Sequence, residues 1–438
     1  MNRRTIAEQI FLAGVESVLP ENLITKEMAL KDNCLVIGHL NFSLELIDNI
    51  YVIGAGKASA MMAVEAEKIL GSRITEGHIV VKYGHSSKLK YIRVTEAGHP
   101  VPDSNGFKAT RAIMEIAGMA KRNDLVVCLL SGGGSALLPD FPEGSSPEEM
   151  IKLNDLLINS GACIKEINAV RKHLSLVKGG QLARAVCPAT LVSLILSDVP
   201  GDPLDVIASG PTAPDPTTYQ QAMDVLDKYD LTASVPVGIL KYLKEGAAGK
   251  RPETPKPGDH VFEKTYNHLI GTNRLALEAA KQKASEFNIN PVIIDDHLQG
   301  DTSSVAEYIV ETSLKFKIDK NEMKPVCLLF GGETTVKMTG RGLGGRNQHL
   351  ALLCAILLQN HPGITILSAG TDGTDGPTDA AGAVVDSDTV TGALSKNIDP
   401  AKYLRDFDSY HFFKKAGGQI ITGPTMTNVM DIIVVIVE

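Results

Sequence analysis

The 438-residue chain lacks tryptophan, a basic tail and any apolar run long enough to cross a membrane. Its longest wholly apolar stretches, 351–358 and 432–437, fall far short of the roughly 20 residues that a membrane-spanning helix needs. The formal net charge is −8 and no lysine- or arginine-rich stripe is present, whereas sequence-independent binding of nucleic acid requires clustered cations. We therefore expect neither a membrane nor a nucleic acid as a partner.

Paired cysteines and an export signal are also missing. The six cysteines are scattered and form no C-x-x-C pair, so buried thiols in a reducing compartment explain them better than disulfides or a zinc site. The first 20 residues include two arginines, but acidic and amide side chains interrupt any signal-peptide core, and the apolar residues follow one helical stripe. These features predict a cytoplasmic protein.

The remaining pattern is that of an α/β protein. With 44% hydrophobic and 21% charged residues, the chain has the composition of a globular protein, and its length predicts two or three domains. Short β-branched runs alternate with stretches of helical period, and several runs are apolar throughout, which predicts parallel strands covered on both faces. The segment 245–259 is rich in proline and glycine, so we expect a linker there, with a hinge nearby.

Nearly the same seven-residue pattern occurs on either side of this segment, at 127–133 and 326–332. Each copy is a buried-strand pattern that runs into two glycines. One interpretation is a turn that is common in α/β proteins. The other is two domains that each present a glycine loop at the carboxyl end of a strand, where ligands of open α/β sheets bind.

The segment 51–59 combines a strand, a glycine turn and the start of a helix. Gly54 and Gly56 would let backbone N–H groups approach an anion, and Lys57 would add a positive charge. The turn is not a dinucleotide fingerprint, because the next strand runs into Lys82 rather than an acidic residue. It is not a Walker A motif either, because alanine follows the lysine. An anion-binding turn and a tight turn with a solvated lysine both stay open.

Three consecutive glycines, 132–134, form the second motif, after the strand expected at 125–130. Such a run is costly in conformational entropy and indicates a backbone that must approach a ligand closely. A flexible turn without a ligand is the alternative. The order of glycine and serine is wrong for a nucleophile elbow, so serine-hydrolase chemistry has no support.

Two further segments carry polar side chains in suggestive places. The expected helix 168–185 puts Arg171, Ser175 and Lys178 on one face beside an apolar stripe. This face either approaches phosphates or is simply solvated. Asp198 directly follows an apolar strand, where it is either a turn residue or a general base or metal ligand.

The densest motif lies between residues 331 and 379 and contains three glycine-rich stretches. Arg346 follows two glycines and precedes a helical run, so its guanidinium and the helix N-terminus could address one anion. Asp372 and Asp375 have the spacing of ligands for a hard cation, without the pattern of an EF-hand. Glycine loops with one lysine, one arginine and several aspartates indicate phosphoryl transfer, which needs positioning and charge neutralisation more than a nucleophile.

The chain resembles the class II glycerate kinases, or glycerate 2-kinases, in the ordered motifs IGAGKAS, LLSGGGSALL, RKHLSLVKGGQLA, LSDVPGDPLDVIASGPTAPD, GGETTV, GRGLGGRNQ and SAGTDGTDGPTDAAG. The resemblance extends from about residue 7 to residue 437. It implies two α/β domains that enclose the active site in a cleft. The first, at 1–244, would be Rossmann-like with a mainly parallel sheet, and the second, at 260–438, would contain a MOFRL module at about 325–435.

The resemblance also implies a reaction, the phosphorylation of D-glycerate by ATP with Mg²⁺, at the 2-hydroxyl, to give 2-phosphoglycerate and ADP. The lysine of the GAGKA turn and the arginine of the GGRNQ run, here Lys57 and Arg346, are thought to be essential in the family. Nucleotide phosphates are expected at the two glycine loops, at Gly54, Gly56, Ser131, Gly132, Gly133, Gly134 and Ser135.

Position and chemistry add further expectations. Asp198 is our candidate for the catalytic base, and Asp372 and Asp375 are candidates for metal ligands. Lys57, Arg346, Asn347 and Glu333 are candidates for contacts with the substrate. A homodimer stays open. The rival functions are an NAD(P)H-dependent hydroxypyruvate reductase, supported only by the glycine turn, and a non-catalytic ligand sensor built on the same fold.

Overall fold

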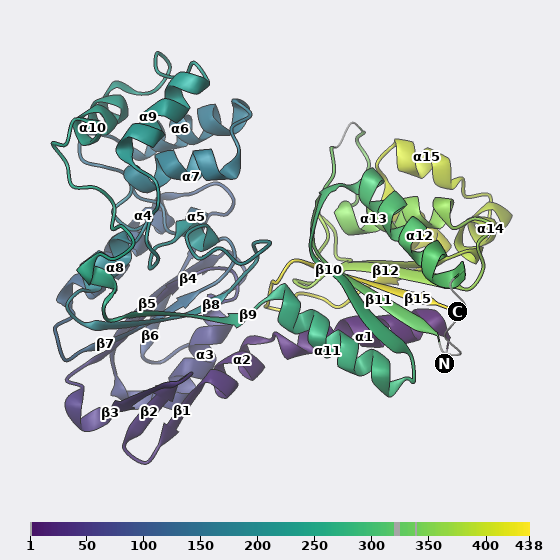
Figure 1. Ribbon diagram of the computed structural model, residues 1–438, viewed down its shortest axis with the longest axis horizontal. Coiled ribbons are helices and arrows are strands. Elements are labelled where there is room, and N and C mark those ends of the chain that lie inside the picture. Colours follow the sequence, from purple (N-terminus) through teal and green to yellow (C-terminus); the bar gives the residue numbers. More distant parts are fainter. Residues whose placement is uncertain (1, 319–324, 338–339) are drawn as a thin grey trace. The chain divides into compact units, whose positions relative to one another are not determined.

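The computed structural model describes residues 2–318, 325–337 and 340–438, which form two compact units (Figure 1). The N-terminal unit consists of Ile24–Ser197 and Asp202–Ile270. The C-terminal unit consists of Gly271–Glu438, the residues before Ile24, and the short segment Asp198–Gly201. Both units contain helices and a sheet, which confirms the expected α/β class. The domain limits 1–244 and 260–438 stay a prediction.

A six-stranded sheet with the order β6-β5-β4-β7-β8-β9 forms the centre of the N-terminal unit. Its strands are β4 (Ile50–Ala55), β5 (Ile74–Lys82), β6 (Ile92–Ala97), β7 (Leu125–Leu130), β8 (Thr190–Leu196) and β9 (Thr265–Gly271). The pairs β6/β5, β5/β4, β4/β7 and β7/β8 are parallel. All residues of β4 and β7 are buried, as expected of parallel strands between layers of helices.

Helices cover both faces of this sheet. Figure 1 shows α4 (Ser104–Met119) and α8 (Gln181–Val186) above the sheet and α3 (Ser59–Leu70) below it. The antiparallel strands β1 (Met28–Lys31), β2 (Cys34–Ile37) and β3 (Leu40–Ser43) form a separate small sheet that we did not predict. Two further helices are α2 (Pro20–Glu27), which precedes β1, and the short α5 (Gly134–Leu137), which follows β7.

Four helices form a cap with its own hydrophobic core in the N-terminal unit (Figure 1). They are α6 (Pro147–Asn159), α7 (Ile164–His173), α9 (Tyr219–Lys228) and α10 (Val237–Ala247). Side chains that start two of these helices satisfy the free N–H groups, because Ser146 and Thr218 each form a capping box. The expected helix 168–185 is wrong as one element: α7 ends at His173, and two glycines with positive φ precede α8.

The predicted linker 245–259 lies wholly inside the N-terminal unit. Thr254 is buried and donates a hydrogen bond to Asp215 over 2.9 Å. Glu253 contacts His173 Nε2 at 3.0 Å and accepts a hydrogen bond from the backbone N–H of Tyr219. The linker prediction is therefore wrong, because polar contacts of its side chains hold this segment against the N-terminal unit.

The sheet of the C-terminal unit is mixed and has the order β10-β11-β15-β12-β13-β14. Its strands are β10 (Asn290–Asp301), β11 (Val326–Thr335), β12 (Ile364–Gly370), β13 (Gly382–Asp386), β14 (Gln419–Ile420) and β15 (Asp431–Val437). Only β10 and β11 pair in parallel. The apolar strand β15 is antiparallel to both neighbours, so its burial on both faces, and not a parallel pairing, explains its composition.

Helices lie on both faces of this second sheet as well. Figure 1 shows α12 and α13 on one face and α1 and α11 on the other. The helices are α1 (Arg3–Ser17), α11 (Asn273–Glu286), α12 (Thr302–Ile318), α13 (Arg346–Leu357), α14 (Asp388–Ser395), α15 (Pro400–Arg405) and α16 (Ser409–Ala416). Among the described residues, no helix is long and apolar enough to span a membrane.

Candidate active site

The N-terminal sheet has one point at which the order of its strands reverses. The chain builds β4, β5 and β6 outward on one side, then returns to place β7 and β8 on the other side of β4. In open α/β sheets, ligands bind at such a switch point, outside the carboxyl ends of the strands. Both predicted glycine loops lie there, because the turn at 54–57 ends β4 and the loop at 131–135 follows β7.

The glycines of the first turn are needed by the protein's own backbone. A Cβ atom at Gly54 would stand 2.3 Å from the carbonyl oxygen of Leu129. Gly56 has φ +140°, and a Cβ there would stand 2.1 Å from Ser131 Oγ. The hydroxyl of Ser131 in turn accepts a hydrogen bond from the N–H of Ala58 over 3.0 Å. The two loops are therefore locked to each other, and their nucleotide-binding role stays a prediction.

Gly56→Ala is expected to lower the free energy of unfolding by about 2 kcal/mol, because the new methyl group has no space and the backbone cannot relax without breaking the contact between the loops. Gly84→Ala is the matched control. Gly84 also has positive φ, at +79°, but nothing lies within 4 Å of its Cβ position, so this variant reports the conformational cost alone. Urea unfolding compares the two. Equal losses of stability would contradict the close packing at Gly56.

Lys57 is the cation at this switch point. Its backbone N–H donates to Gly132 O over 2.9 Å, and its carbonyl oxygen lies 3.1 Å from Nδ1 of His85. No carboxylate among the described residues forms an ion pair with the Lys57 ammonium. Burial lowers the pKa of the neighbouring His99 to about 4, and the charge of Lys57 acts in the same direction. At neutral pH His99 is therefore a neutral group.

A strained turn supports the second glycine loop, and the sequence did not reveal it. Ala208 and Ser209 have φ values of 50° and 62°, a left-handed conformation that side chains rarely adopt. Ser209 Oγ lies 2.8 Å from Oγ of Ser135 and 3.3 Å from Asn168 Oδ1. A Cβ at Gly134 would stand 2.9 Å from that of Ala208. The strained backbone thus places the Ser209 hydroxyl against Ser135 of the second glycine loop. Strained backbone of this kind is common at functional sites.

The expected basic face of the third motif is not an open surface. Ser175 donates to the carboxylate of Asp140, and the buried Lys178 donates to the carbonyl oxygen of Leu138 over 2.5 Å and lies 3.6 Å from that same carboxylate. Arg171 donates to Asn154 Oδ1 over 2.7 Å. The expected single helical face is therefore wrong, because α7 ends at His173, before Ser175 and Lys178. Arg171 and Lys178 instead line a pocket beside the second glycine loop, and their approach to phosphates stays a prediction.

Another buried cation lies close by, and we did not predict it. Lys172 is 2% exposed and lies 3.1 Å from a carboxylate oxygen of Asp205 and 3.5 Å from one of Asp215. Paired charges of this kind keep a buried lysine from being an unsatisfied cation. The sequence does not indicate that Lys172 is buried, because Lys172 stands between the basic residues Arg171 and His173.

Arg346 begins α13 in the C-terminal unit, and carboxylates of the chain itself occupy its guanidinium. Nε and Nη2 donate to the two oxygens of Asp431 over 2.6 and 2.9 Å, and Nη1 lies 2.6 Å from Glu333 Oε1. Burial alone would lower the pKa of Arg346, but the Asp431 and Glu333 carboxylates outweigh it and raise the pKa. Sequence reasoning missed Asp431, which stands alone before an apolar strand.

The N-terminus of α13 is also occupied. The residue before Arg346 is a glycine that offers no side-chain cap. Instead, Asp375 accepts hydrogen bonds from the backbone N–H groups of Asn347 and Gln348 over 3.0 and 2.8 Å. The amide of Asn347 bonds to Asp431, Asp375 and Ser368. The polar atoms of the Asn347 side chain therefore already have partners within the chain. A contact of Asn347 with the substrate stays a prediction.

The two predicted metal ligands have different surroundings. Asp375 is buried, and both its oxygens accept hydrogen bonds from α13. Asp372 accepts hydrogen bonds from the backbone N–H and the hydroxyl of Thr374 in its own turn. Because Mg²⁺ requires carboxylate oxygens that are free to coordinate it, the contacts of Asp375 do not fit a metal site. A metal role for these two residues stays a prediction without support from their contacts.

The stability of the protein is expected to depend on pH through Asp375. Burial raises the pKa of Asp375 to about 6, well above the value of an exposed aspartate, and the nearby Asp431 acts in the same direction. The folded state therefore takes up this proton before the unfolded state does as pH falls. This contribution to stability is complete below about pH 4 and is lost as pH rises through about 6.

Measured against Asp375→Asn, the free energy of unfolding of the wild type should fall by roughly 2 kcal/mol between pH 4 and pH 6.5. Asp399→Asn removes another helix-capping aspartate, which is exposed, and serves as the matched control without burial. Urea unfolding at several pH values gives the comparison. If the difference in the free energy of unfolding between the wild type and Asp375→Asn does not change with pH, the raised pKa of Asp375 is contradicted.

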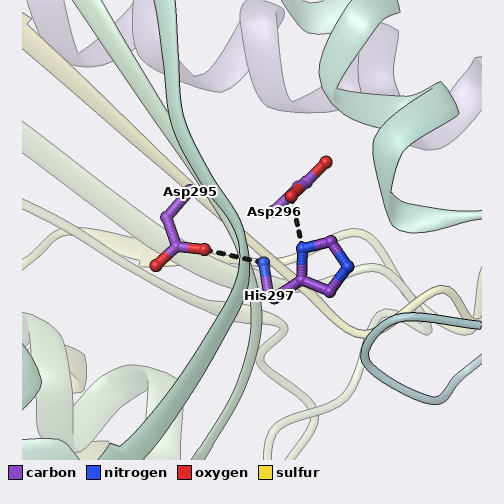
Figure 2. A group of neighbouring side chains, drawn as sticks. All are labelled: Asp295, Asp296 and His297. Atoms are coloured by element: carbon purple, nitrogen blue, oxygen red, sulfur yellow. Dashed lines mark hydrogen bonds and ion pairs between the residues drawn. The ribbon is translucent and has the colours of Figure 1, made fainter.

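One group of side chains among the described residues has three possible metal-binding atoms within 4.8 Å of one another, namely Asp295, Asp296 and His297 on β10 (Figure 2). Internal contacts account for this group. His297 Nδ1 lies 2.5 Å from Asp296, whose other oxygen accepts from Arg274 over 3.1 Å. Asp295 accepts from the backbone N–H of His297 over 2.8 Å. Each member of this group therefore has a hydrogen-bond partner within the chain.

The predicted base, Asp198, is half-buried at the start of the short segment that belongs to the C-terminal unit. It follows β8 as expected. Gly201, at the other end of the segment, lies beside His297, since a Cβ there would stand 3.4 Å from the imidazole ring. The role of Asp198 as a base stays a prediction.

The sequence matches two family models, a domain of unknown function (DUF4147) over residues 6–244 and the MOFRL family over residues 326–431. It is 44% identical to D-glycerate 2-kinase of Thermotoga maritima, over 98% of this chain and 97% of the relative. It is 38% identical to glycerate 2-kinase of Pyrococcus horikoshii, over 100% and 98% of the two chains. A relative from Agrobacterium vitis, named a putative hydroxypyruvate reductase, is 40% identical over 87% of this chain and 85% of its own.

The fold is similar to solved structures over the same extent. The crystal structure of a glycerate kinase from Thermotoga maritima has a TM-score of 0.87 at 41% identity and covers 99% of both chains. A crystal structure of a protein from Pyrococcus horikoshii has a TM-score of 0.86 at 38% identity, with coverage of 100% and 99%. Sequence and structure therefore agree over both units.

Proposed function

This chain belongs to the glycerate kinase family with a C-terminal MOFRL region, and we propose that it transfers the γ-phosphoryl group of ATP to the 2-hydroxyl of D-glycerate, giving 2-phosphoglycerate and ADP. The observation that carries the proposal is the place of Lys57, which forms no ion pair with any carboxylate that the structure describes, beside two interlocked glycine loops at the switch point of the N-terminal sheet. Phosphoryl transfer depends on positioning and on neutralising the phosphate charges. Lys57 and the loop at 131–135 supply both in this proposal.

The transfer itself requires one proton acceptor. The 2-hydroxyl oxygen of glycerate forms a bond to the γ-phosphorus, the bond from that phosphorus to the bridging β–γ oxygen breaks, and ADP leaves. The hydroxyl proton passes to a general base, for which we propose Asp198. Such a base typically contributes 10²–10⁴-fold to the rate.

Arg346 is our candidate for binding the glycerate carboxylate. Its two carboxylate partners differ, because the side chain of Asp431 is 4% exposed and that of Glu333 is 42% exposed. A substrate carboxylate that replaced Glu333 would find the guanidinium still oriented by Asp431. A planar fork of this kind binds carboxylates with two parallel hydrogen bonds. Asn347 keeps the Asp431 carboxylate in place.

Mg²⁺ belongs to the proposed reaction as the companion of the ATP phosphates, whose charge it neutralises. Because the contacts of Asp375 do not fit a ligand, Asp372 is the predicted metal ligand that we retain as a candidate. A homodimer and a cytoplasmic location remain part of the proposal, without a residue that carries either one.

The reductase alternative finds less support, although one relative bears that name. In dinucleotide-binding folds, an acidic residue at the end of the second strand holds the ribose. Here β5 ends in Lys82, which cannot accept a hydrogen bond from ribose hydroxyls. A ligand sensor would have no need of the proposed base, Asp198.

Product analysis tests the proposal. The purified protein is incubated with ATP, Mg²⁺ and D-glycerate, and the products are separated so that 2-phosphoglycerate and 3-phosphoglycerate are distinguished. We expect ADP and 2-phosphoglycerate in equal amounts. Formation of 3-phosphoglycerate would overturn the assigned hydroxyl. If the protein binds glycerate but forms no ADP, it is a ligand sensor. If it oxidises NADH in the presence of hydroxypyruvate, it is a reductase.

A further inference from the structure

A pocket of about 420 Å³ opens in the N-terminal unit next to the second glycine loop. Gly133, Ser135 and Ala136 of that loop form part of its lining. The pocket therefore shares residues with the place where the proposed function puts the phosphates of ATP. Its volume lies within the range of sites that bind small molecules, roughly 300–1,000 Å³.

The pocket has mostly apolar walls. They include Val101 before α4 and Met150 and Ile158 of α6. Val101 is 64% exposed and Ile158 is 59% exposed, so these side chains are available to cover a ligand. Apolar side chains of this size stabilise a flat heterocycle by removing its faces from water. A three-carbon hydroxy acid has no apolar surface that could use them.

The charged groups in the lining balance. Lys178 and Asp140 lie 3.6 Å apart and are both largely buried. Arg171, held by Asn154, is offset by the exposed Asp155 of α6. A pocket without net charge suits the uncharged part of a ligand. The guanidinium of Arg171 can also stack on an aromatic ring.

From these features we propose that the pocket is the nucleoside subsite, in which the base and ribose of ATP bind while the phosphates extend along the loop at 131–135. The inference rests on the proposed function and adds the place of the nucleoside to it. Lys57 marks the phosphate end, since its side chain passes 3.6 Å from the Cβ position of Gly133. The apolar side chains of α6 mark the end that holds the base.

Ile158→Asp tests the subsite, because the residue is exposed and the unit should fold without it. The KM for ATP should rise about tenfold, a loss of roughly 1.4 kcal/mol of binding, and the KM for D-glycerate should change less than twofold. Val101→Asp, on a different segment of the lining, should act in the same way. Val237→Asp is the matched control, since Val237 is 83% exposed on α10 of the same cap and does not line the pocket.

Two binding measurements keep this test separate from that of the kinase reaction. Calorimetry with ADP should show weaker binding to Ile158→Asp than to Val237→Asp, even if glycerate proves not to be phosphorylated. Inorganic tripolyphosphate should compete with ADP equally well in both variants, because tripolyphosphate has no nucleoside that could occupy the pocket. Equal ADP affinities, or a loss of tripolyphosphate competition in Ile158→Asp alone, would overturn the subsite.

Discussion

Lys57→Ala is expected to lower kcat for the phosphorylation of D-glycerate by about 10²–10³-fold, the effect of removing one preorganised group that stabilises charge in a transition state. The physical reason is that Lys57 has no carboxylate partner among the described residues, so its charge is available to the phosphates. The two locked glycine loops hold it at the switch point of the sheet. Removal of an unpaired cation leaves no buried charge behind, so stability should change little.

Lys88→Ala provides the matched control, since Lys88 is an exposed lysine of the same unit. It should keep wild-type turnover. Initial rates of ADP formation at saturating ATP and glycerate give kcat, and urea unfolding shows whether the Lys57 variant is folded. Turnover like that of the wild type in a folded Lys57→Ala protein would remove the lysine from the proposed mechanism.

Asp431→Asn is expected to lower the free energy of unfolding by about 2–4 kcal/mol. Removing one partner of a buried pair leaves the other charge uncompensated, which typically costs about 3–5 kcal/mol. The value here should lie lower, because the side chain of Arg346 is 32% exposed and water screens part of its charge. Asp431 also accepts a hydrogen bond from Asn347, so the loss extends to the start of α13.

The salt bridge between Arg3 and Glu438 offers a control on the same unit. Its distance, 2.6 Å, is the same, but its side chains are 32% and 45% exposed. Glu438→Gln should therefore cost less than about 1 kcal/mol, as measured for surface pairs. Similar losses in the two variants, determined by urea unfolding, would show that burial of Asp431 contributes nothing.

The sequence predicted those strands of the fold whose residues are buried on both faces and are therefore almost all apolar. The strands expected at 125–130, in the segment 51–59 and directly before Asp198 all correspond to strands of the N-terminal sheet, namely β7, β4 and β8. A strand covered on both faces has an apolar sequence of recognisable length. The direction of a strand has no such signal: β15 is apolar throughout, yet it is antiparallel to both of its neighbours. The small sheet β1–β3 was missed, because its short strands alternate buried and accessible residues only partly.

The candidate site could be predicted only in part, for a related reason. Glycine turns and a lysine at a strand end are local patterns, and both were found where expected. The partner of Arg346 is Asp431, 85 residues away along the chain, and only the folded sheet brings the two together. The strained pair Ala208 and Ser209 was also missed, since left-handed backbone at an alanine has no signature in sequence.

The placement of α1 has a consequence for how the protein forms during synthesis. The first helix leaves the ribosome early, yet it packs in the C-terminal unit, where Arg4 pairs with Asp386 and the carbonyl oxygen of Val18 accepts a hydrogen bond from Thr427. That last contact spans 409 residues. Contacts of such long range are slow to form. The C-terminal unit can therefore be completed only after the strands that follow residue 271 have been made, and a fragment that starts at residue 271 would lack α1.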